Sequence, residues 1–481
     1  MFDLFYHIWY NKSGTIRRYD MHRTVRICIR KGSRLYEYCR QAAMASARLY
    51  NRANYIVRQY VTAADRLAEN KPLHQNQSEI CELVSALSDG TDYAPQSKWL
   101  KYKTLDYVLK ASKDAAYYGV YSQANQQTLK LLMRDYRSYF GAVKKYKAHP
   151  EEFKGHPKLP GYCKQGKYKT TILTNQICTV KDGHYLKLPG TKTRINLGKE
   201  LNGSLQEVRI VPTNGVFYLE IVVSCADQGI MLPEDIKEYN ASLLKEAAGY
   251  EDISGLRIVS IDPGTDNLCA MTNNFGMQPI LIKGTILKSV NRYYNKQLAN
   301  MKSKAELCNK AKDTNRIRRL THKRNCIITD GMHKISRYIT GYCVTNNVDI
   351  IVLGHNAGQK QGINIGDANN QNFVQLPFLK LVHMLRYKLA QAGIRMIVTE
   401  ESYTSKADYL AGDDIPVYKK DDDRQFVFSG RRIARGLYRH RDGTISNADI
   451  NGAANIMRKV FPKVTQWDRG VVDTPCAVYV A

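Results

Sequence analysis

An apolar run that ends on an acid, Ile258-Val259-Ser260-Ile261-Asp262-Pro263-Gly264, governs the interpretation of the second half of the chain. A second acid, Asp449, stands near the start of a distant run typical of a helix, Asn447-Ala448-Asp449-Ile450-Asn451-Gly452-Ala453-Ala454-Asn455-Ile456. Taken alone, the first acid is typical of a turn and the second of a helix N-cap. Together they indicate a divalent-cation site, because hard cations prefer oxygen ligands.

The composition points to a polyanionic partner. The 481 residues contain 72 Lys and Arg against 44 Asp and Glu, a formal net charge of +28. Surface charge of this size attracts nucleic acid, with an anionic membrane surface as the alternative. No run of about 18 apolar residues exists, so we expect no membrane span. The N-terminus lacks the pattern of a signal peptide. The 11 cysteines are scattered without a Cys-x-x-Cys pair, which favours reduced thiols in a cytosol.

The hydrophobic periodicity changes twice along the chain. A strand at 24–29 precedes helical patterns at about 33–60 and 105–146. Short strands follow from about 156, and Pro212-Thr213-Asn214-Gly215 between two apolar runs predicts a hairpin. After a polar, acidic linker, strand and helix patterns alternate, which predicts an α/β domain. Its expected strands are 256–261, 269–272, 279–282, 349–353 and 395–399.

The acid-bearing segments resemble a known family. Ile261-Asp262-Pro263-Gly264 and Ala448–Ile456 look like the first and third RuvC motifs of TnpB proteins and type V CRISPR effectors. The track Asn370–Phe378 and the later Tyr403-Thr404-Ser405-Lys406 are similar to that family as well. The resemblance is specific over about 256–460, and the first half agrees only in the order of its segments.

This resemblance implies an α/β multidomain protein in which an RNase H-like (RuvC) nuclease domain is joined to a small β-barrel (wedge-type) domain with an inserted helical recognition domain. The expected segments are 1–32 for the first barrel strands, 33–150 for the helical insert, 151–226 for the barrel, 227–252 for the linker, 253–400 for the first nuclease part with a basic helical lid at about 290–346, 401–446 for a mini-domain and 447–481 for the second nuclease part and tail.

The chain departs from the family where the second acid is expected. The family's second motif places Glu after an apolar strand, but here Ile350-Ile351-Val352-Leu353 is followed by Gly354. The neighbouring predicted strand ends in Glu400-Glu401. Adjacent strands lie about 4.8 Å apart, so a Glu from that strand end can reach the same site through the space that Gly354 leaves. Successive strand residues face opposite sides, so one of the two serves. We favour Glu401, with Glu400 as the alternate.

A second departure concerns the metal ribbon that the family usually carries before the third motif. Between Glu401 and Asp449 the chain has no Cys and only His440, so we expect no zinc. We expect instead a metal-free mini-domain that contacts DNA near the scissile phosphate, with solvated surface charge as the alternative. The charged runs that indicate it are Asp413-Asp414, Lys419-Lys420, Asp421–Asp423 and Arg431–Arg439.

The predicted site and its contacts follow from the resemblance. Asp262, Glu401 and Asp449 would hold two Mg²⁺, with Mn²⁺ as a possible substitute, and Asn447, Asn451 and Arg431 would orient phosphate. Predicted nucleic-acid contacts are Arg316, Arg318, Arg319, Lys323, Arg324, Arg431, Arg432, Arg435, Arg40, Asn51, Tyr55, Gln123 and Gln126.

The function implied is guide-RNA-directed cleavage of double-stranded DNA beside a short flanking motif. Two alternatives stay open: an RNA-guided DNA-binding protein that does not cut, which Gly354 favours, and a protein-only RNase H-like nuclease or transposase. The origin of the guide, from a transposon or a CRISPR array, is not encoded in this sequence.

Overall fold

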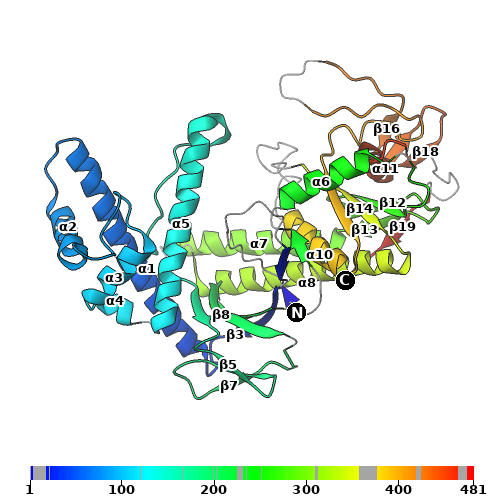
Figure 1. The fold of residues 1–481 in the computed structure, drawn as a ribbon. Coiled ribbons are helices and arrows are strands. Elements are labelled where there is room, and N and C mark those ends of the chain that lie inside the picture. The colour runs from blue at the N-terminus through cyan, green and yellow to red at the C-terminus, as the bar shows by residue number, and fades with distance from the viewer. Residues whose placement is uncertain are drawn as a thin grey trace. The chain divides into compact units, whose positions relative to one another are not determined.

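The computed structural model describes residues 2–3, 18–20, 22–119, 121–164, 166–198, 200–201, 203–224, 231–233, 236–250, 252–308, 313–356, 376–418, 424–463 and 474–480. Residues 370–375 and 419–423, which carry part of the family track and of the charged runs, lie outside the described residues. The chain divides into two compact units, and both contain helices and strands (Figure 1). The first is Met1–Tyr6 with Met21–Gln228, and the second is His7–Asp20 with Gly229–Ala481.

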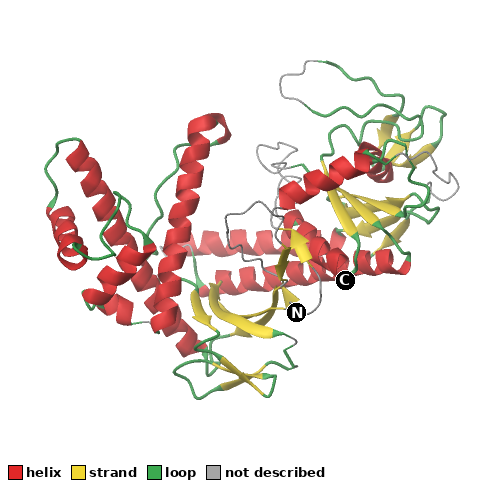
Figure 2. Ribbon diagram, viewed as in Figure 1, coloured by secondary structure: helices red, strands yellow, loops and turns green. Residues whose placement is uncertain are grey.

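The first unit contains a helical layer built around α1 (Tyr36–Ala68) and α5 (Ser122–Ala148). Figure 2 shows these two long helices in contact, and Leu49, Ile56, Leu129 and Leu132 are buried in their shared core. The remaining helices are α2 (Gln75–Ser88), α3 (Tyr102–Ala111), α4 (Ala115–Tyr118) and the 3₁₀ turn η1 (Pro150–Glu152). The stretch expected as helical from 105 is therefore interrupted, because Lys113 adopts a positive φ of 52° and Asp114 then caps α4.

The β-rich part of the first unit is an open sheet. Its antiparallel strands follow the order β1 (Phe2–Asp3), β3 (His22–Ile29), β9 (Val216–Ser224), β8 (Ser204–Thr213), β4 (Thr171–Thr174). The predicted hairpin is confirmed: Thr213 pairs with Val216, and Asn214 and Gly215 between them both have positive φ, as a type I′ turn requires. The expected closed barrel is not found among the described strands, because β1 and β4 stand at opposite edges. A separate small sheet contains β5 (Thr179–Lys181), β6 (Tyr185–Lys187) and β7 (Arg194–Asn196).

The second unit is built on a mixed six-stranded sheet. Its order is β15 (Arg395–Thr399), β14 (Ile350–Gly354), β11 (Ile258–Asp262), β12 (Asn267–Asn273), β13 (Ile280–Lys283), β19 (Cys476–Val478). The strands β11, β14 and β15 are parallel, so their carboxyl ends lie at one edge. They read as continuous apolar runs because helices cover both faces.

Helices cover the two faces of this sheet (Figure 1). On one face, α6 (Ile236–Ala248) and α11 (Ala448–Val460) bury Leu243, Ala247, Ile456 and Met457 against the strands. On the other face lie α8 (Asn315–Thr345) and α10 (Phe378–Gln391), which pack on each other.

The segment 227–252, expected as a linker, contains regular structure. It includes β10 (Met231–Pro233), which pairs with β2 (Arg18–Asp20), and half of its residues form the helix α6. The high charge of this segment concealed a short apolar stripe, because Leu243 and Ala247 are one helical turn apart and both are buried.

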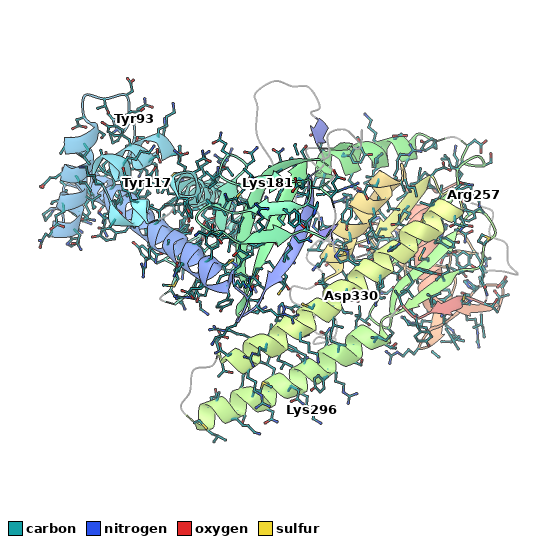
Figure 3. All side chains as sticks on the ribbon, turned by 90° about the horizontal axis from the view of Figure 1, so that it is seen from below. Tyr93, Tyr117, Lys181, Arg257, Lys296 and Asp330 are labelled. Carbon is teal, nitrogen blue, oxygen red and sulfur yellow. The ribbon has the colours of Figure 1, made fainter. Side chains whose placement is uncertain are left out.

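The basic stretch expected as a lid at about 290–346 forms a helical hairpin. It consists of α7 (Thr285–Leu307) and α8, and Figure 3 shows the two helices side by side, with Lys296 on α7 and Asp330 on α8. The helices pack closely where Gly331 faces Leu287: a Cβ at position 331 would lie 2.7 Å from Leu287 Cδ2. Among the described residues, no helix has the length and apolarity needed to cross a membrane.

Candidate functional site

The ends of three parallel strands bring the predicted acids to one edge of the sheet. Ile261 pairs with Leu353, so Asp262 on β11 stands beside Gly354 on β14. Gly354 in turn pairs with Thr399, the last residue of β15, and Glu401 follows two residues later. Gly354 is therefore the centre of the edge, with one predicted acid on each side.

Glu401 occupies the space that a side chain at position 354 would fill. A Cβ added to Gly354 would lie 3.0 Å from Glu401 Oε2 and 2.5 Å from Ile456 Cδ1 of α11. The backbone around Glu401 is fixed, since its N–H donates to Asn356 Oδ1 at 3.0 Å and its carbonyl accepts from the Thr404 hydroxyl at 2.9 Å. The structure thus brings the Glu401 carboxylate to Gly354, the position at which the second acid was expected.

Glu400 is directed elsewhere. Its carboxylate forms an ion pair with Lys459, in the last turn of α11, and accepts a hydrogen bond from the Ser402 N–H at 2.8 Å. Burial raises the pKa of Glu400, but these hydrogen bonds outweigh burial and bring it below the ordinary value. The Lys459 ion pair holds Glu400 away from Gly354, so the geometry favours Glu401 of the two candidates.

Asp449 lies in the first turn of α11 but does not cap it. Asn447 is the N-cap, because its Oδ1 accepts from the N–H groups of Asp449 and Ile450 at 3.0 and 3.3 Å. The side chain of Asp449 is therefore available to face the sheet, where its Oδ2 accepts a hydrogen bond of 2.6 Å from Asn267 Nδ2. Its other oxygen, Oδ1, lies 3.7 Å from Arg432 Nη2.

Asp262 packs against α11 where the helix has no side chain. A Cβ at Gly452 would lie 2.6 Å from Asp262 Oδ2, so the glycine is required for this close approach. Burial, followed by the negative charges of Glu401 and Asp449, raises the pKa of Asp262 well above its ordinary value, while Arg432 opposes this effect. The strand register beside Gly354 and the approach of Asp262 to Gly452, in the first turns of the helix that carries Asp449, place the three acids at the same end of the sheet.

Glu401 has a buried carboxylate oxygen, Oε2, that lacks a hydrogen-bond donor among the described residues. Burial, followed by the charge of Glu400, raises the pKa of Glu401 from 4.5 to about 7, although Lys459 opposes the change. A buried carboxylate oxygen without a donor is destabilising unless a proton or a cation neutralises it.

The donor set at this edge fits a hard cation. The three predicted ligands offer only oxygen atoms, which suits Mg²⁺, and the orphaned Glu401 Oε2 is an acceptor that a cation would satisfy. Among the described residues, however, no three His, Cys, Asp or Glu side chains stand ready as a metal-binding group. The carboxylates are neighbours rather than a preformed cage, so a cation would have to draw them together.

A second buried polar cluster supports α11 from the mini-domain. Asp408 Oδ1 lies 2.6 Å from His440 Nδ1, and His440 Nε2 lies 2.7 Å from Ser446 Oγ. Both Asp408 and His440 are fully enclosed. This cluster joins the loop at 404–413 to the sheet of β16 (Arg431–Ala434), β17 (Leu437–Arg439) and β18 (Ile445–Asn447).

The small polar residues of α11 hold the same loop. Asn451 Nδ2 donates to the Ala407 carbonyl at 2.9 Å, and Asn455 Nδ2 donates to the carbonyls of Thr404 and Ala407 at 2.9 and 2.6 Å. Asn447 and Asn451, predicted to orient phosphate, thus have structural partners inside the chain: one caps the helix and the other anchors the loop. Arg431 is exposed on β16.

The predicted contacts on α8 divide into two kinds. Arg316, Arg319 and Lys323 are exposed, whereas Arg318 is paired with Asp313 at 3.1 Å. Arg324 is half-buried in the hairpin, where its Nε donates to Asn291 Oδ1 at 2.7 Å and its guanidinium lies over the Tyr294 ring. Near the acidic edge, Arg435 pairs with Asp266, which also pairs with Lys288.

The predicted contacts in the first unit also have partners within the chain. Asn51 binds the backbone of Cys163 through both side-chain atoms, at 2.8 and 2.7 Å, and Gln123 bonds with Thr174 and Gln176. Arg40 pairs with Glu37. Tyr55 packs beside the helical core, and Gln126 is half-buried on α5. Their contact with nucleic acid stays a prediction.

Sequence reasoning missed three residues that orient the acids. Asn267 binds Asp449, Lys283 Nζ donates to Asn267 Oδ1 at 2.7 Å, and Lys459 holds Glu400. The only signal for the first pair was that β12 begins soon after the turn at Gly264, which brings it back beside β11. Lys459 gave no signal, because its partner lies 59 residues away in the sequence.

Comparison with solved structures finds distant likenesses. One is a chain of a Cas12f1–sgRNA–target DNA complex, at 14% identity over 88% of this chain and 82% of that chain, with a TM-score of 0.41. A CRISPR-Cas12f ternary complex has 12% identity over 87% and 80%, with a TM-score of 0.31. The AacC2c1–sgRNA binary complex has 10% identity over 89% and 70%, with a TM-score of 0.31. No curated protein matches the chain.

Two family models match the second unit over the segments that contain the site. The model described as a probable transposase, OrfB of the IS605 type, matches residues 252–359 and includes Asp262 and Gly354. The Cas12f1-like TNB domain model matches residues 378–456 and includes Glu401, the mini-domain and Asp449. These matches fall on the acidic edge and agree with the RuvC-like motifs, and they support the similarity of the chain to TnpB proteins and type V effectors.

Proposed function

We propose that the protein is a guide-RNA-directed DNA endonuclease and that the sheet of the second unit is its RuvC-type, RNase H-like nuclease domain. The observation that carries the proposal is the meeting of Asp262, Glu401 and Asp449 at one sheet edge, where Asp262 lies in the field of both other acids. Acids this poorly neutralised are costly to the fold, and such sites are typical of function.

The chemistry is phosphodiester hydrolysis. Asp262, Glu401 and Asp449 would hold Mg²⁺, which supplies an activated water and stabilises the leaving oxygen. The protein's own residues prepare the site: Gly452 admits the Asp262 carboxylate, Gly354 admits that of Glu401, and Asn267 orients that of Asp449. Arg432 contributes positive charge beside Asp449, where a substrate phosphate would lie.

We propose guide RNA and target double-stranded DNA with a short flanking motif as the partners. The net charge of +28 and the exposed Arg316, Arg319 and Lys323 on α8 support a polyanion that is gripped without sequence reading. Base pairing with the guide would supply the sequence specificity. The first unit would serve as the wedge-type and helical recognition part.

The test begins with the RNA that accompanies the purified protein. We expect a discrete RNA to co-purify, and sequencing it identifies the guide and its origin. The complex with Mg²⁺ should then cut DNA that pairs with that guide. Asp262→Ala should lose cleavage and keep guide-dependent DNA binding. Absence of a bound RNA, or intact matched DNA with the wild-type complex, would overturn the proposal.

Gly354 favours one competing function, an RNA-guided DNA-binding protein that does not cut, because the strand in the middle of the site carries no acid. The two functions differ in one result. The binding-only protein would shield its target DNA from other nucleases in the presence of Mg²⁺ and release no cut product.

A further inference from the structure

The pair Asn267 and Lys283 controls how Asp449 presents its oxygens. Lys283 Nζ lies 2.7 Å from Asn267 Oδ1, and Asn267 Nδ2 lies 2.6 Å from Asp449 Oδ2. An ammonium group can only donate hydrogen bonds, so it must face the amide oxygen and leave the amide NH₂ for the acid. The order of donors and acceptors therefore fixes the orientation of the Asn267 side chain.

The backbone aims this relay at the site. Asn267 and Lys283 are direct cross-strand partners, and the pairing of β12 with β13 shifts register between Asn267 and Cys269. A register shift of this kind redirects side chains and is common beside active sites. The turn before β12 is equally constrained, because a Cβ at Gly264 would lie 2.6 Å from the Asn267 carbonyl oxygen. Asn267 is 9% exposed, so solvent does not compete strongly for its amide.

The relay leaves the two oxygens of Asp449 unequal. Oδ2 is engaged by Asn267, whereas Oδ1 has only the looser contact of 3.7 Å with Arg432. A cation bound through Asp449 therefore finds Oδ1 the less engaged oxygen, and two-oxygen ligation would have to share Oδ2 with the Asn267 amide. Mg²⁺ accepts such single oxygens in a strict octahedral shell, while Ca²⁺ readily takes carboxylates in the two-oxygen mode.

We propose that Asn267, held by Lys283, is a positioning residue that favours ligation through one oxygen of Asp449 and so favours Mg²⁺ over Ca²⁺. The inference rests on the proposed function, since it assigns Asp449 to a cation site. Loss of an outer partner of a metal ligand typically weakens metal affinity by about 10-fold to 100-fold. Asn267→Ala should weaken Mg²⁺ binding by at least about 10-fold and weaken Ca²⁺ binding less, because the freed carboxylate accepts the two-oxygen mode.

The experiment measures cation binding without requiring cleavage. Titrations of the RNA-free, full-length chain with Mg²⁺ or Ca²⁺, followed by the rise in thermal midpoint, give an apparent affinity for each ion. Asp262→Ala defines cation binding outside the site and is subtracted. Lys283→Met removes the donor but keeps the stem, so it should change the ratio of Mg²⁺ to Ca²⁺ affinity in the same direction as Asn267→Ala, by a smaller factor.

Asn273 offers a matched control at the other end of β12. It is also buried, at 6% exposed, but its amide binds the backbone of Met277 and Phe275, away from the acids. Asn273→Ala should lower the thermal midpoint and leave the affinity ratio unchanged. If Asn267→Ala keeps the wild-type ratio, the inference is wrong while the proposed nuclease stands. If the wild type binds no more cation than Asp262→Ala, the metal site of the proposed function and the inference both fail.

Discussion

Two groups of buried residues in the second unit contain acids, and the acids are satisfied in opposite ways. Asp408 accepts hydrogen bonds from His440 and from the N–H groups of Leu410, Ala411 and Arg441. Burial raises the pKa of Asp408, but these donors outweigh burial and bring it below the ordinary value. At the sheet edge, Glu401 Oε2 has no partner among the described residues and its pKa is raised to about 7.

The difference separates a structural acid from a functional one. The hydrogen-bond donors around Asp408 stabilise its negative charge. Asp408 thereby ties the mini-domain to the loop that packs on α11. Asp262 and Glu401 are left in need of positive charge that the described side chains supply only weakly, through Arg432 and Lys459. A cation bound at this edge would supply that charge. The comparison predicts effects of opposite sign when the two kinds of acid are neutralised.

The largest effect should be on cleavage at the unsatisfied cluster. Glu401→Gln removes a metal-ligand charge and should lower the cleavage rate by at least roughly 1000-fold, since such ligands supply several kcal/mol of transition-state stabilisation. In metal-free buffer at pH 8 the same change should raise the thermal midpoint. Glu400→Gln is the matched control, because its partner is Lys459, and it should cost less than about 10-fold in rate. A reversed order of the two variants would assign the site to Glu400.

The satisfied cluster should respond in stability. Asp408→Asn leaves His440 and three backbone N–H groups facing an amide, and breaking a buried charged network costs about 3 to 5 kcal/mol in free energy of unfolding. Urea unfolding of Asp408→Asn and Glu401→Gln in metal-free buffer at pH 8 measures the two changes in free energy of unfolding, which should have opposite signs. Stabilisation by Asp408→Asn would contradict the distinction between the clusters.

The pH dependence should sharpen the same contrast. The folded chain holds the Glu401 proton more tightly than the unfolded chain, so the free energy of unfolding in EDTA should fall as pH rises from about 4.5 through about 7. The pKa shift corresponds to about 3 kcal/mol, and Asp262 acts in the same direction. Thermal midpoints between pH 5 and 8 should show a smaller decline in Glu401→Gln and in wild type with Mg²⁺. A midpoint that rises across this range in EDTA would contradict the raised pKa.

The smallest effect concerns the shape of the edge. Gly354→Ala places a Cβ against Ile456 and the Glu401 carboxylate, and overpacking of this kind costs about 1 to 3 kcal/mol. Adding Ile456→Val should restore part of the stability but little of the cleavage rate, because the methyl group still displaces Glu401. Unfolding curves and cleavage rates of the single and double variants test this, and full recovery of cleavage would show that only Ile456 mattered.

The positions of Asp262 and Asp449 and most strands of the sheet could be predicted from the sequence. Asp262 and Asp449 stand in local patterns that carry their structural context with them, a strand end and a helix start. The choice between Glu400 and Glu401 rested on strand alternation, yet β15 ends at Thr399, before either residue. Lys459, on a distant helix, separates the two in the structure.

What the sequence did not predict depended on contacts between distant segments. Asn267 reaches Asp449 through a shift in strand register, which no local pattern encodes. The helix α6 was hidden because its charged residues outweigh the two that are buried. The barrel was expected from the short strands and from the family resemblance, whereas closure depends on whether the edge strands pair.

The space above Gly354 has a consequence for protein engineering. Glu401 and Ile456 both occupy the volume that a side chain at position 354 would need. A Glu introduced at position 354 would meet the ends of both side chains at once, so moving the acid onto the central strand calls for smaller residues at 401 and 456 in the same variant.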